Sequence, residues 1–150
     1  MIVVSAEALQ PSELLSSLEA DAKHCGAVVS FTGKMRETGE NNTPLKALYL
    51  EHYPDMTERS LENIVSRAKQ KFHVEYVVLC HRVGSIYPDE PIVFVAVASE
   101  HRKASFDATS MIMDYLKNEA PFWKKEIYLD GSECWVAQKD SDQLAYKTWQ

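Results

Sequence analysis

Basic side chains are unevenly spread along this acidic chain, and two groups of them could bind an anion. Lys34 and Arg36 follow a strand-like segment, and His101, Arg102 and Lys103 stand where an apolar segment meets a predicted helix. Free backbone N–H groups at a helix start favour acidic neighbours, so three basic residues there oppose the helix dipole. A phosphate or carboxylate ligand would explain them. A solvated basic turn that pairs with nearby carboxylates is the competing interpretation.

A second group of lysines could take part in proton transfer. Lys117 lies at the C-terminal end of the same predicted helix, where the helix dipole alone would explain it. Lys124 and Lys125 follow the apolar segment 121–123. A lysine that is desolvated beside such a wall, or crowded by other cations, has a lowered pKa and can act as a nucleophile, acid or base. Spacing alone does not show whether these lysines lie near the first two groups.

Other reactive patterns are missing from the sequence. Cys25, Cys80 and Cys134 are far apart, which argues against a disulfide framework and a zinc site and favours three buried thiols. Cys80 and His81 are neighbours on a predicted strand, so their side chains point to opposite faces and cannot act together. The sequence contains no nucleophile elbow, Walker A loop or dinucleotide-binding glycine motif.

Composition limits the class of protein. A length of 150 residues, of which 45% are hydrophobic and 25% charged, predicts one domain spanning residues 1–150. The net charge of -6 argues against broad binding to nucleic acid. The longest apolar run, residues 92–98, is far shorter than the ~18 residues that a membrane span needs. The N-terminus also lacks the basic region of a signal peptide, so we expect a cytoplasmic protein.

Local patterns predict the elements that position these residues. Helices are predicted from Pro11 to about Gly26, from a capping box at Asp55 to Phe72, and between Ser99 and the helix-breaking Pro121. Residues 33–44 are polar, contain two glycines and predict a long exposed loop. Strands are predicted over residues 1–5, 27–32, 45–52, 74–80, 92–98, 126–129 and 134–137.

The order of these elements predicts an α+β fold. Three main helices on one face of a mainly antiparallel sheet are the natural outcome of the alternation of strands and helices. The first six elements also match a ferredoxin-like order, which is an alternative topology.

Seven segments, in order from residue 26 to near the end of the chain, resemble the large, catalytic subunit of molybdopterin synthase. Each segment is weak alone, but their ordered combination is specific to the family. The segments are GAVVSFTGKMR (26–36), LEHYPDMT (50–57), HRVG (81–84), VFVAVASEHR (93–102), MDYLK (113–117), APFWKKE (120–126) and residues 135–142.

The resemblance implies an α/β-hammerhead fold and a homodimer within a heterotetramer. It also implies that sulfur passes from the C-terminal Gly-Gly thiocarboxylate of a small ubiquitin-like subunit to cyclic pyranopterin monophosphate, which forms the molybdopterin dithiolene. The family holds no metal or other cofactor at this stage. An enzyme of the sulfurtransferase class is therefore expected.

The resemblance also assigns site residues by position. Lys117 and Lys124 match the two active-site lysines of the family, and the His101–Arg102 pair would reach the site from the neighbouring subunit. The pterin-binding segments correspond to Lys34, Met35, Arg36, His101, Arg102, Lys124, Lys125 and Glu126. Lys139 stands where the family often has arginine, and lysine there keeps the charge but loses bidentate geometry.

Two other classes of function remain open at this stage. The chain could be a docking module for a ubiquitin-like protein without catalysis, although docking alone does not require Lys117 and Lys124. It could also be an unrelated enzyme that uses the basic pocket for another phosphorylated small molecule. That enzyme would need no protein partner.

Overall fold

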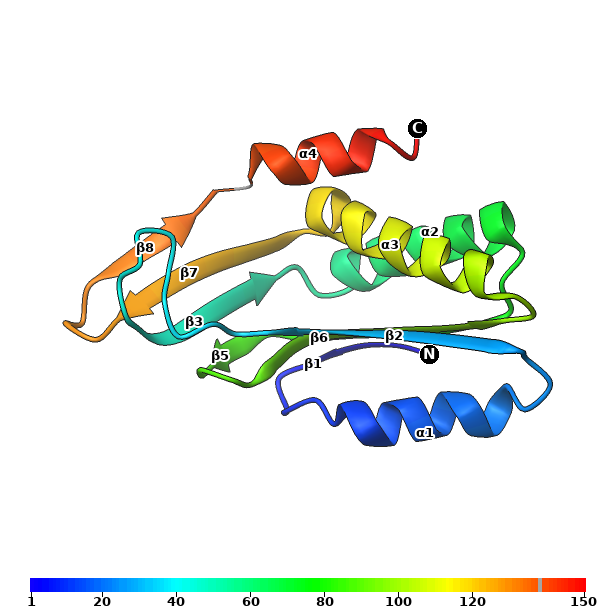
Figure 1. Ribbon diagram of the computed structural model, residues 1–150. Coiled ribbons are helices and arrows are strands. Elements are labelled where there is room, and N and C mark those ends of the chain that lie inside the picture. The colour runs from blue at the N-terminus through cyan, green and yellow to red at the C-terminus, as the bar shows by residue number, and fades with distance from the viewer. Residues whose placement is uncertain (138) are drawn as a thin grey trace.

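The computed structural model describes residues 1–137 and 139–150, so Gln138, inside the last segment of the family resemblance, lies outside the described residues. The described strands form two four-stranded sheets, and Figure 1 shows how the helices are arranged around them. The first sheet has the order β1 (Ile2–Ser5), β4 (Tyr76–Arg82), β6 (Pro91–Ser99) and β2 (Ala27–Lys34). The second has the order β5 (Gly84–Ile86), β3 (Leu45–His52), β7 (Phe122–Tyr128) and β8 (Glu133–Val136).

The first sheet is covered by helices on both faces. Helix α1 (Pro11–Asp21) packs on one face, and α2 (Met56–Phe72) and α3 (Arg102–Glu119) pack on the other (Figure 1). The two inner strands, β4 and β6, are therefore buried on both sides, which explains why residues 92–98 form an unbroken apolar run. The predicted placement of all helices on one face is wrong for α1.

The second sheet separates this fold from the ferredoxin-like alternative. Strand β3 does not belong to the first sheet but pairs antiparallel with β5 and β7 in the second. The ferredoxin-like order is therefore wrong. All described strand pairs are antiparallel except β1 with β4, which confirms the predicted mainly antiparallel α+β class. Phe122 packs against the apolar clusters of both sheets and so joins them.

The start of α2 differs from the predicted capping box. Asp55 is the N-cap residue, but its side chain makes no capping hydrogen bond and its φ is 69°. The buried Thr57 hydroxyl instead accepts a hydrogen bond from the Tyr53 N–H at 3.1 Å and donates one to the Pro121 carbonyl at 3.4 Å. These bonds tie the helix start to the segment that leads into β7.

A fourth helix, α4 (Asp140–Lys147), and the short strand β5 were not predicted. Few apolar side chains mark α4, and the C-terminal segment is held by polar contacts and by the packing of Tyr146 and Trp149 against the core. The Trp149 indole donates to Asp114 at 2.6 Å, and the Tyr146 hydroxyl donates to Glu119 at 2.7 Å. Figure 1 shows α4 beside α3, on the side away from the sheet.

Two smaller expectations also need correction. The segment 33–44 is not wholly exposed, because β2 continues to Lys34 and the Met35 side chain is buried. The three cysteines are not all buried: Cys80 is buried, Cys25 is half-buried and Cys134 is exposed. All three are free thiols, in agreement with the expectation of no disulfide framework.

Candidate active site

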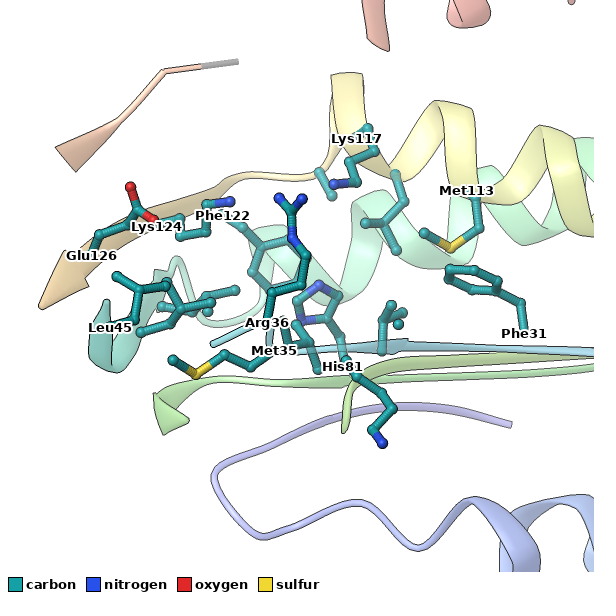
Figure 2. A pocket seen from close by; sticks show the side chains of 18 of the residues that line it. Phe31, Met35, Arg36, Leu45, His81, Met113, Lys117, Phe122, Lys124 and Glu126 are labelled. Carbon is teal, nitrogen blue, oxygen red and sulfur yellow. The ribbon is translucent and has the colours of Figure 1, made fainter. Parts of the chain in front are cut away.

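A cavity of about 300 Å³ lies between the two sheets and the C-terminal end of α3 (Figure 2). Its apolar lining includes Leu45, Leu48 and Leu50 of β3, Met113 and Leu116 of α3, and Phe122 of β7. Its polar lining comprises Lys34, Arg36, Thr38, Glu40, His81, Lys117, Lys124 and Glu126. Met35 also contributes to the cavity wall. Six of the nine predicted site residues therefore line one cavity: Lys34, Met35, Arg36, Lys117, Lys124 and Glu126.

Three cations converge on this cavity from three separate elements. Lys117 comes from the last turns of α3, Lys124 from β7, and Arg36 from the segment after β2. In Figure 2 the side-chain nitrogens of the two lysines point toward one another, with the Arg36 guanidinium between them in this view. A concentration of positive charge in a partly apolar cavity suits an anionic ligand.

The environment of Lys124 makes it a candidate for proton transfer. Burial lowers the pKa of Lys124 from its usual range, and the nearby charge of Lys117 lowers it further. The carboxylates of Glu126 and Glu40 act in the opposite direction. Such a lysine exchanges its proton more readily at neutral pH than an exposed lysine does.

The backbone around Met35 places Arg36 at the cavity. The Met35 N–H donates to the Glu90 carbonyl at 2.9 Å, and the Met35 carbonyl accepts from the Asp89 N–H at 3.0 Å. The buried Met35 side chain thus anchors the chain just before the exposed Arg36. Lys34 lies on the cavity lining, and its ammonium forms a 2.5 Å ion pair with Asp89.

Glu126 holds the segment 38–44 against the cavity. Its buried carboxylate accepts hydrogen bonds from the Tyr128 hydroxyl at 3.2 Å and from the Glu40 N–H at 3.5 Å. Gly39 lies so close to this carboxylate that a Cβ there would collide with it. Glu126 therefore has a positioning role in addition to lining the cavity.

Lys125 does not line the cavity, because neighbouring residues of β7 alternate between the two faces of the sheet. Its ammonium pairs with Glu133 at 3.2 Å and lies 5.4 Å from the ring centroids of Tyr49 and Trp135. Trp123 shares this outer face and packs edge-on against Tyr53, so it is not part of the apolar wall predicted beside Lys124.

His101 and Arg102 also lie away from the cavity within one chain. They begin α3, and Lys117 lies 15 residues further along, which is about 22 Å of helix. Both side chains are exposed, and the only ion pair that the structure gives either of them, within the described residues, joins His101 to Glu100 at 3.6 Å. A single chain therefore does not bring these two residues to Lys117.

Sequence reasoning missed His81, which lies in the cavity wall with only 4% of its surface exposed. Its imidazole stacks on Phe122 with ring centroids 3.9 Å apart and an interplanar angle of 17°. Strand alternation could have found it, since Gly33, His81 and Val93 are paired across three neighbouring strands and all line the cavity. The same alternation directs the Cys80 side chain to the opposite face of β4.

Residues 1–137 and 139–150 contain neither a metal-binding cluster nor a membrane-spanning helix. Among those residues, no group of three or more His, Cys, Asp or Glu side chains is arranged to hold a metal ion. No helix among them is long and apolar enough to cross a membrane.

The fold and the cavity define a class: an α+β protein with a cavity lined by three lysines and an arginine. The model of the MoaE protein family matches residues 4–119. The chain belongs to the MoaE family, as its resemblance to molybdopterin synthase large subunits predicted.

Individual relatives extend the match over nearly the whole chain. The molybdopterin synthase catalytic subunit of Salmonella typhimurium is 50% identical over 124 residues, covering 83% of this chain and 81% of that protein. The corresponding subunit of Pseudomonas aeruginosa is 43% identical over 149 residues, covering 99% and 98%. The solved structure of the molybdopterin biosynthesis MoaE protein from Burkholderia ambifaria superposes with a TM-score of 0.84 at 37% identity, covering 99% and 97%.

Proposed function

We propose that this chain is the catalytic subunit of a molybdopterin synthase, a cytoplasmic sulfurtransferase formed by one domain over residues 1–150. It transfers sulfur from the C-terminal thiocarboxylate of a small ubiquitin-like subunit to cyclic pyranopterin monophosphate and so forms the molybdopterin dithiolene. The convergence of Arg36, Lys117 and Lys124 on one cavity is the observation that carries this proposal. Membership of a family with relatives named molybdopterin synthase catalytic subunit supports the same reaction.

The charge of the cavity suits both reactants. The substrate carries a cyclic phosphate and the tail of the small subunit ends in a thiocarboxylate, so both are anions. Arg36 offers a planar guanidinium that can donate two parallel hydrogen bonds to phosphate, while Lys117 and Lys124 act as compact charges. A Gly-Gly tail has no side chains and can enter a narrow cavity whose positive charge attracts it.

The two lysines support different steps of sulfur transfer. A carbon–sulfur bond to the substrate forms, water cleaves the carbonyl–sulfur bond of the tail, and an oxygen function leaves the substrate. Negative charge develops on the tail carbonyl and on the leaving oxygen. We assign stabilisation of the thiocarboxylate or the intermediate to Lys117, and general acid–base work to Lys124, whose pKa is lowered by burial and by Lys117.

A homodimer would bring His101 and Arg102 to the cavity of the neighbouring subunit. Strand β2 is an edge of the first sheet, and the exposed side chains of Val28 and Phe31 lie on it. An open, partly apolar edge strand can pair with a second copy of itself. Antiparallel pairing about a two-fold axis would set Ala27 of one copy opposite Lys34 of the other.

The position of Ala27 relates this pairing to α3, because Ala27 pairs with Ser99, which lies next to the start of α3. A two-fold seam along β2 would therefore carry the partner subunit's His101 and the partner subunit's Arg102 toward Lys34 and Arg36. The proposed dimer accounts for two predicted binding residues that a single chain leaves far from Lys117.

Reconstitution tests the proposed function. The purified chain is mixed with a thiocarboxylated small subunit and cyclic pyranopterin monophosphate, and the product is oxidised to a fluorescent pterin for detection. We expect dithiolene product only when both proteins are present. Stable binding of the small subunit without product would favour the docking-module alternative, and turnover without the small subunit would favour an unrelated enzyme.

A further inference from the structure

His81 is a buried histidine whose position the proposed roles of the lysines do not use. It lies near the end of β4, packs face to face on Phe122, and forms part of the cavity wall. In the view of Figure 2 its imidazole lies beside the side chains of Arg36 and Phe122. A residue held this rigidly can present one ring atom to a ligand in a fixed direction.

The hydrogen bonding of His81 defines which ring nitrogen carries the proton. Its Nδ1 lies 2.8 Å from the Arg82 carbonyl oxygen, and a carbonyl only accepts, so Nδ1–H is the donor. In the neutral ring, Nε2 then bears a lone pair. The structure gives Nε2 no hydrogen-bond donor among residues 1–137 and 139–150.

The surroundings keep the ring neutral at physiological pH. Burial is the main reason that the pKa of His81 is lowered to about 4, and the proximity of Lys117 and His52 adds to it, whereas the hydrogen bond to Arg82 acts in the opposite direction. A second positive charge beside Lys117 is thereby avoided. Nε2 of His81 is consequently an acceptor and not a donor.

We propose that Nε2 of His81 accepts a hydrogen bond from a ring N–H or hydroxyl group of the pterin substrate and orients that substrate beside Lys117. This inference rests on the proposed function. Arg36, Lys117 and Lys124 can only donate while charged, so they suit the phosphate and the thiocarboxylate. The donors of the heterocycle need acceptors, and His81 supplies a neutral one on the Phe122 side of the cavity.

Two substitutions separate this role from a purely structural one. In His81→Asn the amide nitrogen can still donate to the Arg82 carbonyl, as Nδ1 does, but no acceptor reaches the position of Nε2. In His81→Gln the longer side chain returns an amide oxygen to about that position. His24→Asn serves as a matched control, because His24 is exposed and pairs with Glu75 outside the cavity.

The experiment measures binding of cyclic pyranopterin monophosphate by titration calorimetry, KM and kcat in the reconstituted synthase, and the affinity for the small subunit. Loss of one hydrogen bond predicts about tenfold weaker substrate binding and a similarly raised KM for His81→Asn. His81→Gln should recover to within about threefold of wild type. Affinity for the small subunit should stay unchanged in all three variants.

Other outcomes would overturn the proposal. Wild-type substrate binding in His81→Asn would show that Nε2 makes no contact. Equal losses in both variants, together with weaker binding of the small subunit, would show that the ring only supports the cavity wall. If the wild-type proteins themselves make no dithiolene, the proposed function fails, and that result is distinct from any difference between the His81 variants.

Discussion

At the scale of single residues, the cavity combines the Arg36 guanidinium with the ammonium groups of three lysines, and these cations have different surroundings. Arg36 is exposed and anchored through the buried Met35, whereas Lys124 is half-buried next to Lys117. The proposed roles, binding by a fixed charge and proton transfer by a lysine with a lowered pKa, therefore belong to different side chains. Substitution of Arg36 or of Lys124 therefore tests each role separately.

Arg36→Ala should weaken binding of cyclic pyranopterin monophosphate by about 10- to 100-fold, because a charge-assisted bond to phosphate is lost. Docking of the small subunit should change much less. Titration of each ligand against the variant measures both effects, with Arg59→Ala on the exposed side of α2 as control. Equal losses of both affinities would contradict a phosphate-binding role.

His81 makes stability depend on pH in a defined direction. Its pKa is about 4 in the folded protein and 6.5 when exposed, so the unfolded chain binds more protons between these values. Above pH 6.5 the buried His81 does not reduce the free energy of unfolding. As the pH falls below 6.5 this free energy decreases, and the loss reaches about 3 kcal/mol below pH 4.

The variant His81→Gln cannot titrate there, so it should lose less stability on acidification than wild type. Denaturant unfolding at pH 7.5 and pH 4.5 measures the difference, since the other titrating groups are common to both proteins. Parallel pH dependence of the two proteins would mean that the buried imidazole is not held neutral.

Most of the site residues predicted from the sequence are charged, and Met35 was predicted from the family resemblance alone. Lys34, Arg36, Lys117 and Lys124 were predicted from clusters of cations and from the family resemblance, and all four line the cavity. His81 was not predicted, because its role depends on two sheets meeting around it. A local pattern contains no information about Phe122 stacking on a strand more than forty residues away.

At the scale of elements, the segment 35–44 contributes several residues to the lining of the cavity. An isolated β-bridge between Thr38 and Pro44 joins the two ends of this loop, and the Glu126 carboxylate accepts a hydrogen bond from the Glu40 N–H. Gly39 is required there because of its contact with the Glu126 carboxylate. The absence of a side chain at Gly39 therefore allows the buried Glu126 carboxylate to hold the loop.

Gly39→Ala should displace this loop, destabilise the protein by about 1–3 kcal/mol, and raise the KM for the pterin substrate. The added methyl group collides with a carboxylate that is itself buried and hydrogen-bonded. Thermal unfolding and steady-state kinetics measure both effects, and Asn41→Ala in the same loop is the control. Unchanged KM in Gly39→Ala would show that the loop does not shape the site.

Elements with a strong apolar pattern were predictable, and elements held by polar contacts were not. The run 92–98 and the apolar face of α2 predicted β6 and its covering helix, because burial on one or both faces leaves a clear pattern. Helix α4 has no buried side chain and is held by Tyr146 and by Trp149 beyond its end. Such long-range hydrogen bonds leave no periodic signal.

At the scale of the whole molecule, the proposed active site is shared between two subunits. Lys117 and Arg102 lie at opposite ends of α3, so a site that uses both must take them from different chains. Mixing two inactive variants tests this arrangement directly. Hybrid dimers of Lys117→Ala and Arg102→Ala would contain one site with both residues intact.

After dissociation and random reassociation of the two variants, about one quarter of wild-type activity should return, since half of the dimers are hybrids with one intact site of two. The reconstituted synthase assay measures the recovery, and each variant subjected alone to the same treatment is the control. No recovery beyond the sum of the separate variants would place both residues in one chain's site.

Formation of dithiolene by Lys117→Ala is the most direct test of the central proposal. The variant and wild type are compared in the reconstituted assay, with circular dichroism for folding and titration of the small subunit for assembly. We predict that Lys117→Ala folds, binds the small subunit with wild-type affinity and forms no detectable dithiolene. Turnover near the wild-type rate would contradict sulfur transfer assisted by Lys117 in this cavity.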